Sequence, residues 1–277
     1  MKKLQFITML LSMLGVMSLN AQESVTRYTA RQLADTVSMT GRECCIQAIC
    51  YGAVGEKKMQ LEFHEAAMQK GYAPGEYWIS RKCFWNFDDN LEYKLKTLAD
   101  AGDPVGVYSY YLLTRGDSVV EDESYDTVVK SMLEVRKPLL DRVSENDPEV
   151  FYFIYMLSSY DYENPGTEYL IRSAEMGFVP AMMKLAEHLY GERMWAEKIY
   201  DLGYTSIAKD IADTYSGGCY WQAVDVIGSI KWLEKDANDN NNKDSMLSLA
   251  AIYQRGLGVP VDNERAHYWL DRAYNIK

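Results

Sequence analysis

Three histidines and five cysteines are the residues of this 277-residue chain with the most direct routes to metal or nucleophilic chemistry. His64, His188 and His267 lie on different expected helices, and none has a second ligand three or four residues away, as zinc proteases require. We therefore expect His64 and His188 at surface or interhelix positions. The sequence also lacks a Gly-x-Ser-x-Gly motif, a P-loop and a dinucleotide-binding fingerprint.

Cys44, Cys45 and Cys50 lie close together in the sequence, so a disulfide or a zinc site has to be considered. On a helix, Cys45 and Cys50 are separated by about 7.5 Å along the axis, which is too far for a disulfide. The spacing does not match a zinc motif, and no histidine lies nearby. Buried thiols are therefore the favoured interpretation, and a long-range disulfide to Cys83 stays open.

Several pairs of acidic residues have the composition that glycosidases use for acid–base catalysis. They include Asp88 with Asp89, residues 121–123, and Glu145 with Asp147. All fall in expected loops, where runs of charge are usually solvated, and no feature distinguishes one pair from the others. We therefore expect no catalytic residues; an enzyme with an unrecognised site in residues 22–60 is the alternative.

The segment that begins at Asp236 has the polar composition of a calcium-binding loop. Such a loop needs glycine at its sixth position and a bidentate glutamate at its twelfth. Here those positions hold Asn241 and Leu247, so we expect a solvated connection between helices over 237–244. The sequence thus predicts neither a metal site nor a cofactor site.

Aromatic side chains offer binding chemistry instead. Two expected helices are crowded with rings: Tyr108, Tyr110, Tyr111, Phe151, Tyr152, Phe153, Tyr155 and Tyr160. A helix buries about half of its circumference against its neighbours, so some of these rings should face solvent. We expect Tyr108, Tyr111, Phe151 and Tyr152 to contact a partner, by burial in a protein interface or by stacking on a glycan. Complete burial between wide helix pairs is the alternative.

These aromatic helices belong to a repeated helix–loop–helix pattern. Its clearest copy spans 245–273, where apolar residues at helical spacing form one stripe on each of two helices. Gly256 and Gly258 are expected to end the first helix and to allow a tight connection. The stripes consist of Ser245, Leu249, Ala250 and Tyr253 on the first helix, and of Ala266, Trp269, Leu270 and Ala273 on the second.

The stripe of the first helix recurs upstream. Its copies lie at 75–83, 106–114, 150–158, 181–189 and 207–215. A glycine stands four residues before four of them: Gly71, Gly102, Gly177 and Gly203. We expect this glycine to end the preceding helix, and we expect the small residues of the stripes to let two helices approach closely. The pattern predicts an all-α fold built from antiparallel helix hairpins.

The segment 245–273 resembles the Sel-one-like repeat, a relative of the tetratricopeptide repeat. The positions that carry the resemblance are Leu249, Ala250, Tyr253, Gly256, Gly258, Val259, Asp262, Ala266, Trp269 and Ala273. The upstream copies keep the basic residue pattern of the repeat, although most of them lack the Gly-x-Gly-Val loop. The resemblance therefore extends over 61–277. It implies an α-solenoid with a scaffold or adaptor role, and it implies no catalysis by the repeat itself.

The amino terminus has the layout of a secretory signal peptide. Lys2 and Lys3 precede an apolar run over 4–19, and Ala21 stands before the expected cleavage point. The run is shorter than the ~20 residues of a membrane-spanning helix, although an uncleaved anchor or a buried helix is an alternative. We expect a signal peptide over 1–21, an N-terminal helical cap over 22–60 with a helix at 30–49, and the repeats over 61–277.

The charge of the chain narrows the class of partner. The formal net charge is −11, and it becomes −13 once the two lysines of the signal peptide are removed. Nucleic acids and anionic membranes favour clustered Lys and Arg, so neither is an expected ligand. The sequence thus predicts an exported bacterial protein, periplasmic or secreted, that acts as a non-catalytic adaptor for a protein partner; a glycan-binding protein is the alternative.

Overall fold

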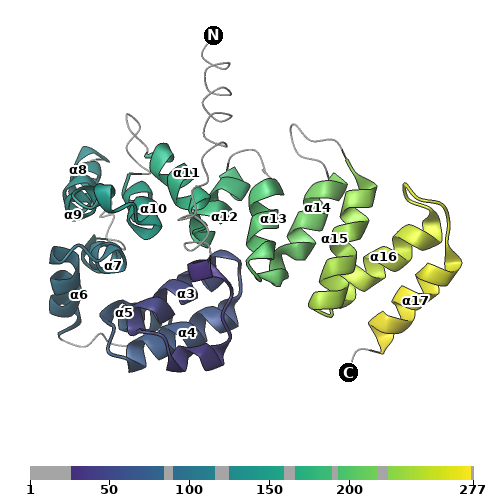
Figure 1. The fold of residues 1–277 in the computed structure, drawn as a ribbon, viewed down its shortest axis with the longest axis horizontal. Helices are drawn as coiled ribbons and strands as arrows, with labels where there is room; N and C mark the ends of the chain where they lie inside the picture. Colours follow the sequence, from purple (N-terminus) through teal and green to yellow (C-terminus); the bar gives the residue numbers. More distant parts are fainter. Residues whose placement is uncertain are drawn as a thin grey trace, which may run out of the picture.

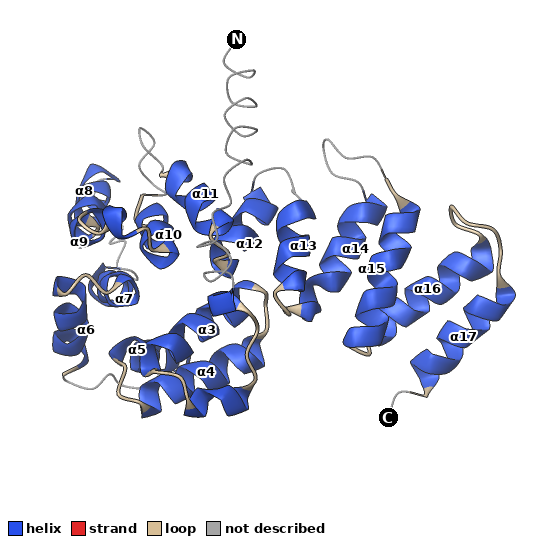
Figure 2. Ribbon diagram, viewed as in Figure 1, coloured by secondary structure: helices blue, strands red, loops and turns tan. Residues whose placement is uncertain are grey.

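The computed structural model describes residues 26–83, 90–115, 125–158, 166–188, 193–217 and 224–275, and these residues form helices and connecting loops without a strand (Figure 2). Short 3-10 helices are η1 (Thr26–Tyr28), η2 (Leu33–Val37), η3 (Val143–Glu145) and η4 (Thr205–Ile207). The α-helices of the first half are α3 (Gly41–Ala53), α4 (Lys57–Gln69), α5 (Ala73–Cys83), α6 (Leu91–Asp100), α7 (Pro104–Arg115), α8 (Tyr125–Val135) and α9 (Lys137–Leu140). Those of the second half are α10 (Pro148–Met156), α11 (Thr167–Glu175), α12 (Val179–His188), α13 (Arg193–Asp201), α14 (Ala208–Gly217), α15 (Val226–Asp239), α16 (Lys243–Arg255) and α17 (Asn263–Tyr274).

Helices that follow one another in the chain pack side by side and form an elongated array (Figure 1). Contacts are densest within the pairs α3/α4, α14/α15 and α16/α17, and further pairs such as α10/α11 and α12/α13 continue the pattern between them. The predicted all-α fold of helix hairpins is therefore confirmed. None of the described helices is both long and apolar enough to cross a membrane.

Glycines end helices where the repeat pattern predicts them. Gly71, Gly102, Gly177 and Gly203 have φ values of 74°, 74°, 91° and 95°, in the left-handed region that side-chain-bearing residues rarely adopt. Each follows a second helix of a pair, so glycine turns the chain into the next pair. The C-cap of α16, Gly256, has a φ of 66° and closes the first helix of the last repeat in the same way.

Small residues also bring helices together, as the repeat pattern predicts. A Cβ at Gly75 would lie 2.7 Å from the Cβ of Ala67 and 2.8 Å from the backbone nitrogen of Met68. A Cβ at Gly106 would lie 2.5 Å from the Cβ of Leu98. Neither position has room for a methyl group. The backbone of α5 at Gly75 therefore packs directly against α4, and the backbone of α7 at Gly106 packs directly against α6.

One expected helix is wrong. The sequence predicts one helix over 30–49, whereas the structure has η2 and then a new helix that begins at Gly41. The cause is a capping box, in which the backbone N–H of Glu43 donates to Oγ1 of Thr40 while the Glu43 carboxylate accepts from the Thr40 N–H at 2.6 Å.

The expected boundaries of the N-terminal cap can be placed on the structure. Residue 60 lies inside α4, and α3 packs against α4 as the helices of later pairs pack against each other. Helix pairing therefore begins with α3, before residue 61. The expected signal peptide over 1–21 lies outside the described residues.

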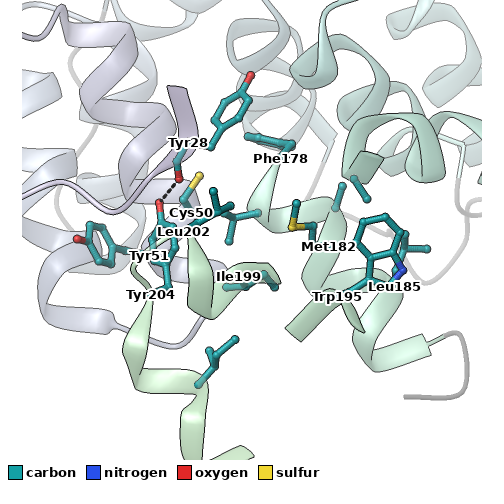
Figure 3. Packing of buried hydrophobic residues seen from close by; sticks show 14 of the residues in the cluster. Tyr28, Cys50, Tyr51, Phe178, Met182, Leu185, Trp195, Ile199, Leu202 and Tyr204 are labelled. Atoms are coloured by element: carbon teal, nitrogen blue, oxygen red, sulfur yellow. Dashed lines mark hydrogen bonds between the residues drawn. The ribbon is translucent and has the colours of Figure 1, made fainter. Parts of the chain in front are cut away.

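The first helix pair returns to the middle of the array. α3 contacts α12, although the two helices are far apart in the sequence, and Figure 1 shows α3 close to α12. We call this contact the seam; it comprises α3 on one side, and α10, α12 and the connection between α13 and η4 on the other. Tyr28, Cys50, Phe178 and Tyr204 gather there in one buried cluster (Figure 3). The main hydrophobic core is therefore continuous across the seam.

Candidate functional site

Three of the four predicted partner-binding side chains lie in the core. Phe151 is fully buried, and Tyr111 and Tyr152 are 7% and 8% exposed. Tyr108 is half-buried, and its ring centroid lies 5.2 Å from that of Phe153. The expectation that these rings face solvent is therefore wrong for Tyr111, Phe151 and Tyr152, and the alternative of burial between helices holds for them. Their contact with a protein or a glycan stays a prediction.

The burial follows from the position of α10. This helix contacts α7, α9 and α11, so it has neighbours on several sides rather than on one face. Tyr152 packs edge-on against Phe178 at 5.2 Å, and the guanidinium of Arg172 lies 4.2 Å above the ring of Phe151. A helix enclosed in this way buries most of its circumference, which explains why its sequence is almost wholly apolar.

His64 and the cysteine side chains that the structure describes are part of the packing, whereas His267 is exposed. Cys44, Cys45 and Cys50 are buried free thiols, as the sequence favours. Nδ1 of His64 lies 3.8 Å from Sγ of Cys45, and burial raises the pKa of Cys50 to about 12, so that thiol stays protonated. Within the described ranges, no group of three His, Cys, Asp or Glu side chains is arranged to hold a metal ion. The side chains of Cys83 and His188 lie outside the description.

The polar segment after Asp236 is mostly helical rather than a loop. α15 continues to Asp239 and α16 begins at Lys243, so the connection is shorter than the predicted one over 237–244. Asp236 is 1% exposed, and its carboxylate accepts hydrogen bonds from Oγ of Ser245 and from Nδ2 of Asn240. The carboxylate therefore joins the two helices, which is why the segment stays tightly folded.

One of the predicted carboxylate pairs is described, and it serves the local structure. Arg142 pairs with Glu145 at 2.7 Å, and Asp147 accepts a hydrogen bond from the backbone N–H of Glu149 at 2.9 Å. The Asp147 contact caps α10 at its amino end. The pairs at 88–89 and 121–123 lie outside the described residues.

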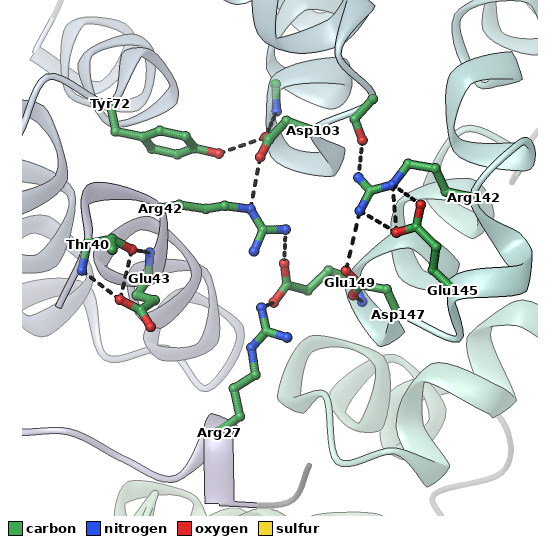
Figure 4. Close-up of polar contacts among 12 residues, drawn as sticks. Arg27, Thr40, Arg42, Glu43, Tyr72, Asp103, Arg142, Glu145, Asp147 and Glu149 are labelled. Atoms are coloured by element: carbon green, nitrogen blue, oxygen red, sulfur yellow. Dashed lines mark hydrogen bonds and ion pairs between the residues drawn. The ribbon is translucent and has the colours of Figure 1, made fainter.

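The most unusual charged group of the described chain is Glu149, which sequence analysis does not single out. Its side chain is completely buried, and it is the only charged residue of α10. One oxygen, Oε1, accepts from the hydroxyl of Tyr28 at 3.1 Å and pairs with Arg27 at 2.9 Å. The other, Oε2, pairs with Arg42 (Figure 4). Both carboxylate oxygens are therefore engaged by residues from the N-terminal part of the chain.

Arg42 extends this cluster to a third element. Its Nε donates to Asp103 at 2.8 Å, at the start of α7, while its terminal nitrogen pairs with Glu149 of α10. Asp103 also accepts from the hydroxyl of Tyr72 at 2.7 Å and from the backbone N–H of Gly106 at 2.7 Å. Arg42 thus ties α3 to α7 and α10 through charge-assisted hydrogen bonds.

The environment of Glu149 determines what this cluster can do. Burial raises the pKa of Glu149, and the positive charges of Arg42 and Arg27 oppose that rise. Burial also raises the pKa of Tyr28, whose hydroxyl therefore remains a hydrogen-bond donor. A carboxylate held by two guanidinium groups and a phenol is well suited to join helices, and it presents no unpaired oxygen to a substrate.

A pocket of about 230 Å³ lies beside this cluster. Its walls come from the segment before α3, from α3 itself and from Glu149. The polar members are Arg27, Arg31, Asp35, Ser38, Glu43, Gln47 and Glu149. Acidic and basic groups are mixed, so the pocket has no strong preference for an anion or a cation. It is a gap beneath the N-terminal segment rather than a preformed catalytic cleft.

The Glu149 cluster is not predictable from the sequence because its members are far apart in the chain. Tyr28 and Glu149 are separated by 121 residues, and no motif links them. The only local signal is the glutamate itself, which stands as a single charge in the apolar stretch 148–156. A lone acid at the start of a helix usually interacts with the helix dipole, so the signal does not indicate a buried ion pair.

Exposed aliphatic side chains gather near the carboxyl end of the array. Val224 and Ile227 lie at the start of α15, and Leu257 and Val261 lie in the connection between α16 and α17. A Cβ at Gly258 would lie 2.8 Å from Val226, which shows that the two segments are adjacent. We call Val224, Ile227, Leu257 and Val261 the C-terminal apolar patch. Ile227 and Val261 are 63% and 60% exposed.

Comparisons with known proteins place this chain beside solved helical-repeat structures. No family model and no curated protein matches the sequence. The chain is similar to the crystal structure of a Sel1 repeat protein from Oxalobacter formigenes, with 18% identity and a TM-score of 0.41, over 92% of this chain and 82% of that one. It is also similar to a protective antigen of uropathogenic Escherichia coli strains that displays an SLR fold, with 14% identity and a TM-score of 0.36.

The second similarity covers 88% of this chain, which spans 64% of the antigen, less than two thirds of its length. The two solved structures are themselves a Sel1 repeat protein and a protein with an SLR fold.

Proposed function

We propose that this chain is an exported, non-catalytic helical-repeat scaffold that binds a protein partner. The described residues form a repeat array, and the buried carboxylate of Glu149 and its partner Arg42 are occupied in joining helices. The observation that carries the proposal is the C-terminal apolar patch, because exposed aliphatic side chains on adjacent segments are a feature of protein interaction surfaces.

The chemistry of the partner follows from the patch and from the charge of the chain. A partner that covers Ile227 and Val261 must present apolar side chains of its own. Binding is favourable because contacts between apolar side chains replace the contact of Ile227 and Val261 with water. The chain carries a formal net charge of −11, which favours association with a surface rich in Lys and Arg. We therefore propose a protein partner whose binding segment combines aliphatic and basic residues.

Export is supported by the amino-terminal residues alone. Lys2 and Lys3, the apolar run over 4–19 and the small residue Ala21 together form a signal peptide layout. N-terminal sequencing of the protein recovered from the bacterial envelope or medium should give a chain that begins at Gln22. A chain that still begins at Met1 in that fraction would contradict cleavage, and recovery from the cytoplasm alone would contradict export.

Partner capture with matched variants tests the binding surface. The wild-type chain, an Ile227→Asp/Val261→Asp variant and a Tyr93→Asp control would each be crosslinked in a native envelope fraction. Tyr93 is 73% exposed on α6, away from the patch, so the control introduces a charge without touching the proposed surface. We expect one dominant protein to be captured by the wild type and by the control, and to be lost from the double variant because buried unpaired charge opposes binding.

The captured protein would then be purified and titrated against the same three chains by calorimetry. Weaker binding by the double variant alone would support the proposal. Equal binding by all three chains would exclude the C-terminal apolar patch as the interface. The absence of any captured protein with the wild type would count against the scaffold function.

A further inference from the structure

The residues that precede α3 occupy the seam in the manner of a bound peptide. We call the segment 26–31 the N-terminal strap. The carbonyl of Tyr28 accepts a hydrogen bond from the hydroxyl of Tyr204 at 3.1 Å, and the N–H of Ala30 donates to the carbonyl of Leu202 at 2.8 Å. The carbonyl of Arg31 accepts from the hydroxyl of Tyr51 at 2.6 Å. These main-chain hydrogen bonds hold the strap without depending on its sequence.

Two side chains of the strap give the contact its specificity. The ring of Tyr28 is 1% exposed and meets the ring of Phe178 edge-on at 5.1 Å. Its hydroxyl reaches Glu149, which also pairs with the neighbouring Arg27. An aromatic ring in an apolar pocket, together with an arginine on a buried carboxylate, is a combination that few other dipeptides can satisfy.

The strap is weakly anchored outside these contacts. The following helix, η2, contains no buried residue, and Val37 within it is 88% exposed. The pocket of about 230 Å³ lies between this segment and α3, so packing beneath it is incomplete. The strap is therefore held at Tyr28, Ala30 and Arg31, and Met39 is the apolar residue of the link to α3 that packs against the core.

We propose that the seam is a peptide-binding groove, that the strap fills it in the resting chain, and that a partner segment with an arginine followed by an aromatic residue displaces the strap. This inference rests on the proposed scaffold function, and it assigns to that function a second contact, separate from the C-terminal apolar patch. The groove recognises the incoming segment through Tyr204, Leu202 and Tyr51 along its backbone, and through Phe178 and Glu149 at its side chains.

A peptide-binding experiment with the full chain tests the inference directly. The probe is a fluorescently labelled synthetic peptide of residues Thr26–Gln32, measured by anisotropy. In the wild type the strap occupies the groove, so binding is weak. The variant Tyr28→Ala empties the aromatic pocket, and we expect it to bind the peptide at least about tenfold more tightly, because a larger fraction of its molecules has an open groove. A peptide with alanine in place of the tyrosine should not bind either chain.

A second variant protects the test against loss of folding. Ala30→Pro removes the N–H that bonds Leu202 and leaves every groove side chain in place, so it should also bind the peptide more tightly than the wild type. Circular dichroism identifies which variants are folded. If the folded variants bind the peptide no better than the wild type, or bind the alanine peptide equally well, the groove assignment is wrong.

The outcome is distinguishable from failure of the proposed function. The peptide assay uses only the purified chain and a synthetic probe, so it does not depend on finding a native partner. If the peptide binds but no partner is captured, the groove assignment is supported and the scaffold function is contradicted. Capture through Ile227 and Val261 without peptide binding would support the scaffold and overturn the groove.

Discussion

The substitution Glu149→Ala is expected to lower the free energy of unfolding by about 3–5 kcal/mol, because it removes a fully buried carboxylate that two guanidinium groups and a phenol hydroxyl share. Arg42 would retain Asp103 but lose the carboxylate on its other side, and Tyr28 would lose its acceptor. Three elements, α3, α10 and the N-terminal strap, meet at this carboxylate. Urea unfolding followed by circular dichroism gives the measurement.

The control for this substitution is Glu145→Ala. Glu145 also pairs with an arginine, Arg142, but half of its side chain is exposed, so solvent screens the interaction. We expect its loss to leave the unfolding midpoint within experimental error. If Glu149→Ala were equally mild, the buried cluster would contribute little beyond its desolvation cost, and the seam would be held by its apolar contacts alone.

The substitution Phe178→Ala is expected to cost a similar amount, about 3–5 kcal/mol, through loss of apolar contacts rather than of charge. Phe178 is fully buried, and its ring lies 5.1 Å from that of Tyr28 and 5.2 Å from that of Tyr152. Its removal would leave a cavity where the strap meets α10 and α12. Denaturant unfolding gives the free energy.

Hydrogen exchange separates this effect from a general loss of stability. The amide of Ala30 donates to Leu202 next to the cavity, so its protection should fall further than that of amides in α16 and α17. Tyr93→Ala, on an exposed side chain, serves as the control and should change neither quantity. Unchanged protection at Ala30 would show that Phe178 does not hold the strap.

The repeated part of the fold is predictable because its determinants are local. Glycines with a left-handed φ, such as Gly203, stand where a helix ends. Small residues, such as Gly75, stand where two helices approach closely. Both signals recur at regular places along the chain. The helix hairpins can therefore be inferred from one sequence without any knowledge of how distant hairpins meet.

The aromatic surface and the seam are not predictable in this way, because both depend on contacts between distant segments. Phe151 and Tyr152 look like a binding surface if α10 has one covered face, and they are core residues once it is enclosed. Tyr28 and Tyr204 meet across 176 residues of chain, a separation at which the spacing of residue types carries no information. Thr40 shows the same limit on a smaller scale, since its capping box overrides the helical pattern around it.

The hydrogen bond from the hydroxyl of Tyr204 to the carbonyl of Tyr28 has a consequence for the order in which the parts of the chain fold. Helix pairs can form one after another as the chain is synthesised, since their contacts are mostly between sequence neighbours. The strap is among the earliest described residues to be made, yet the carbonyl of Leu202 and the hydroxyl of Tyr204 that hold it do not exist until much later. The strap can therefore dock only after the middle of the chain has been synthesised and folded.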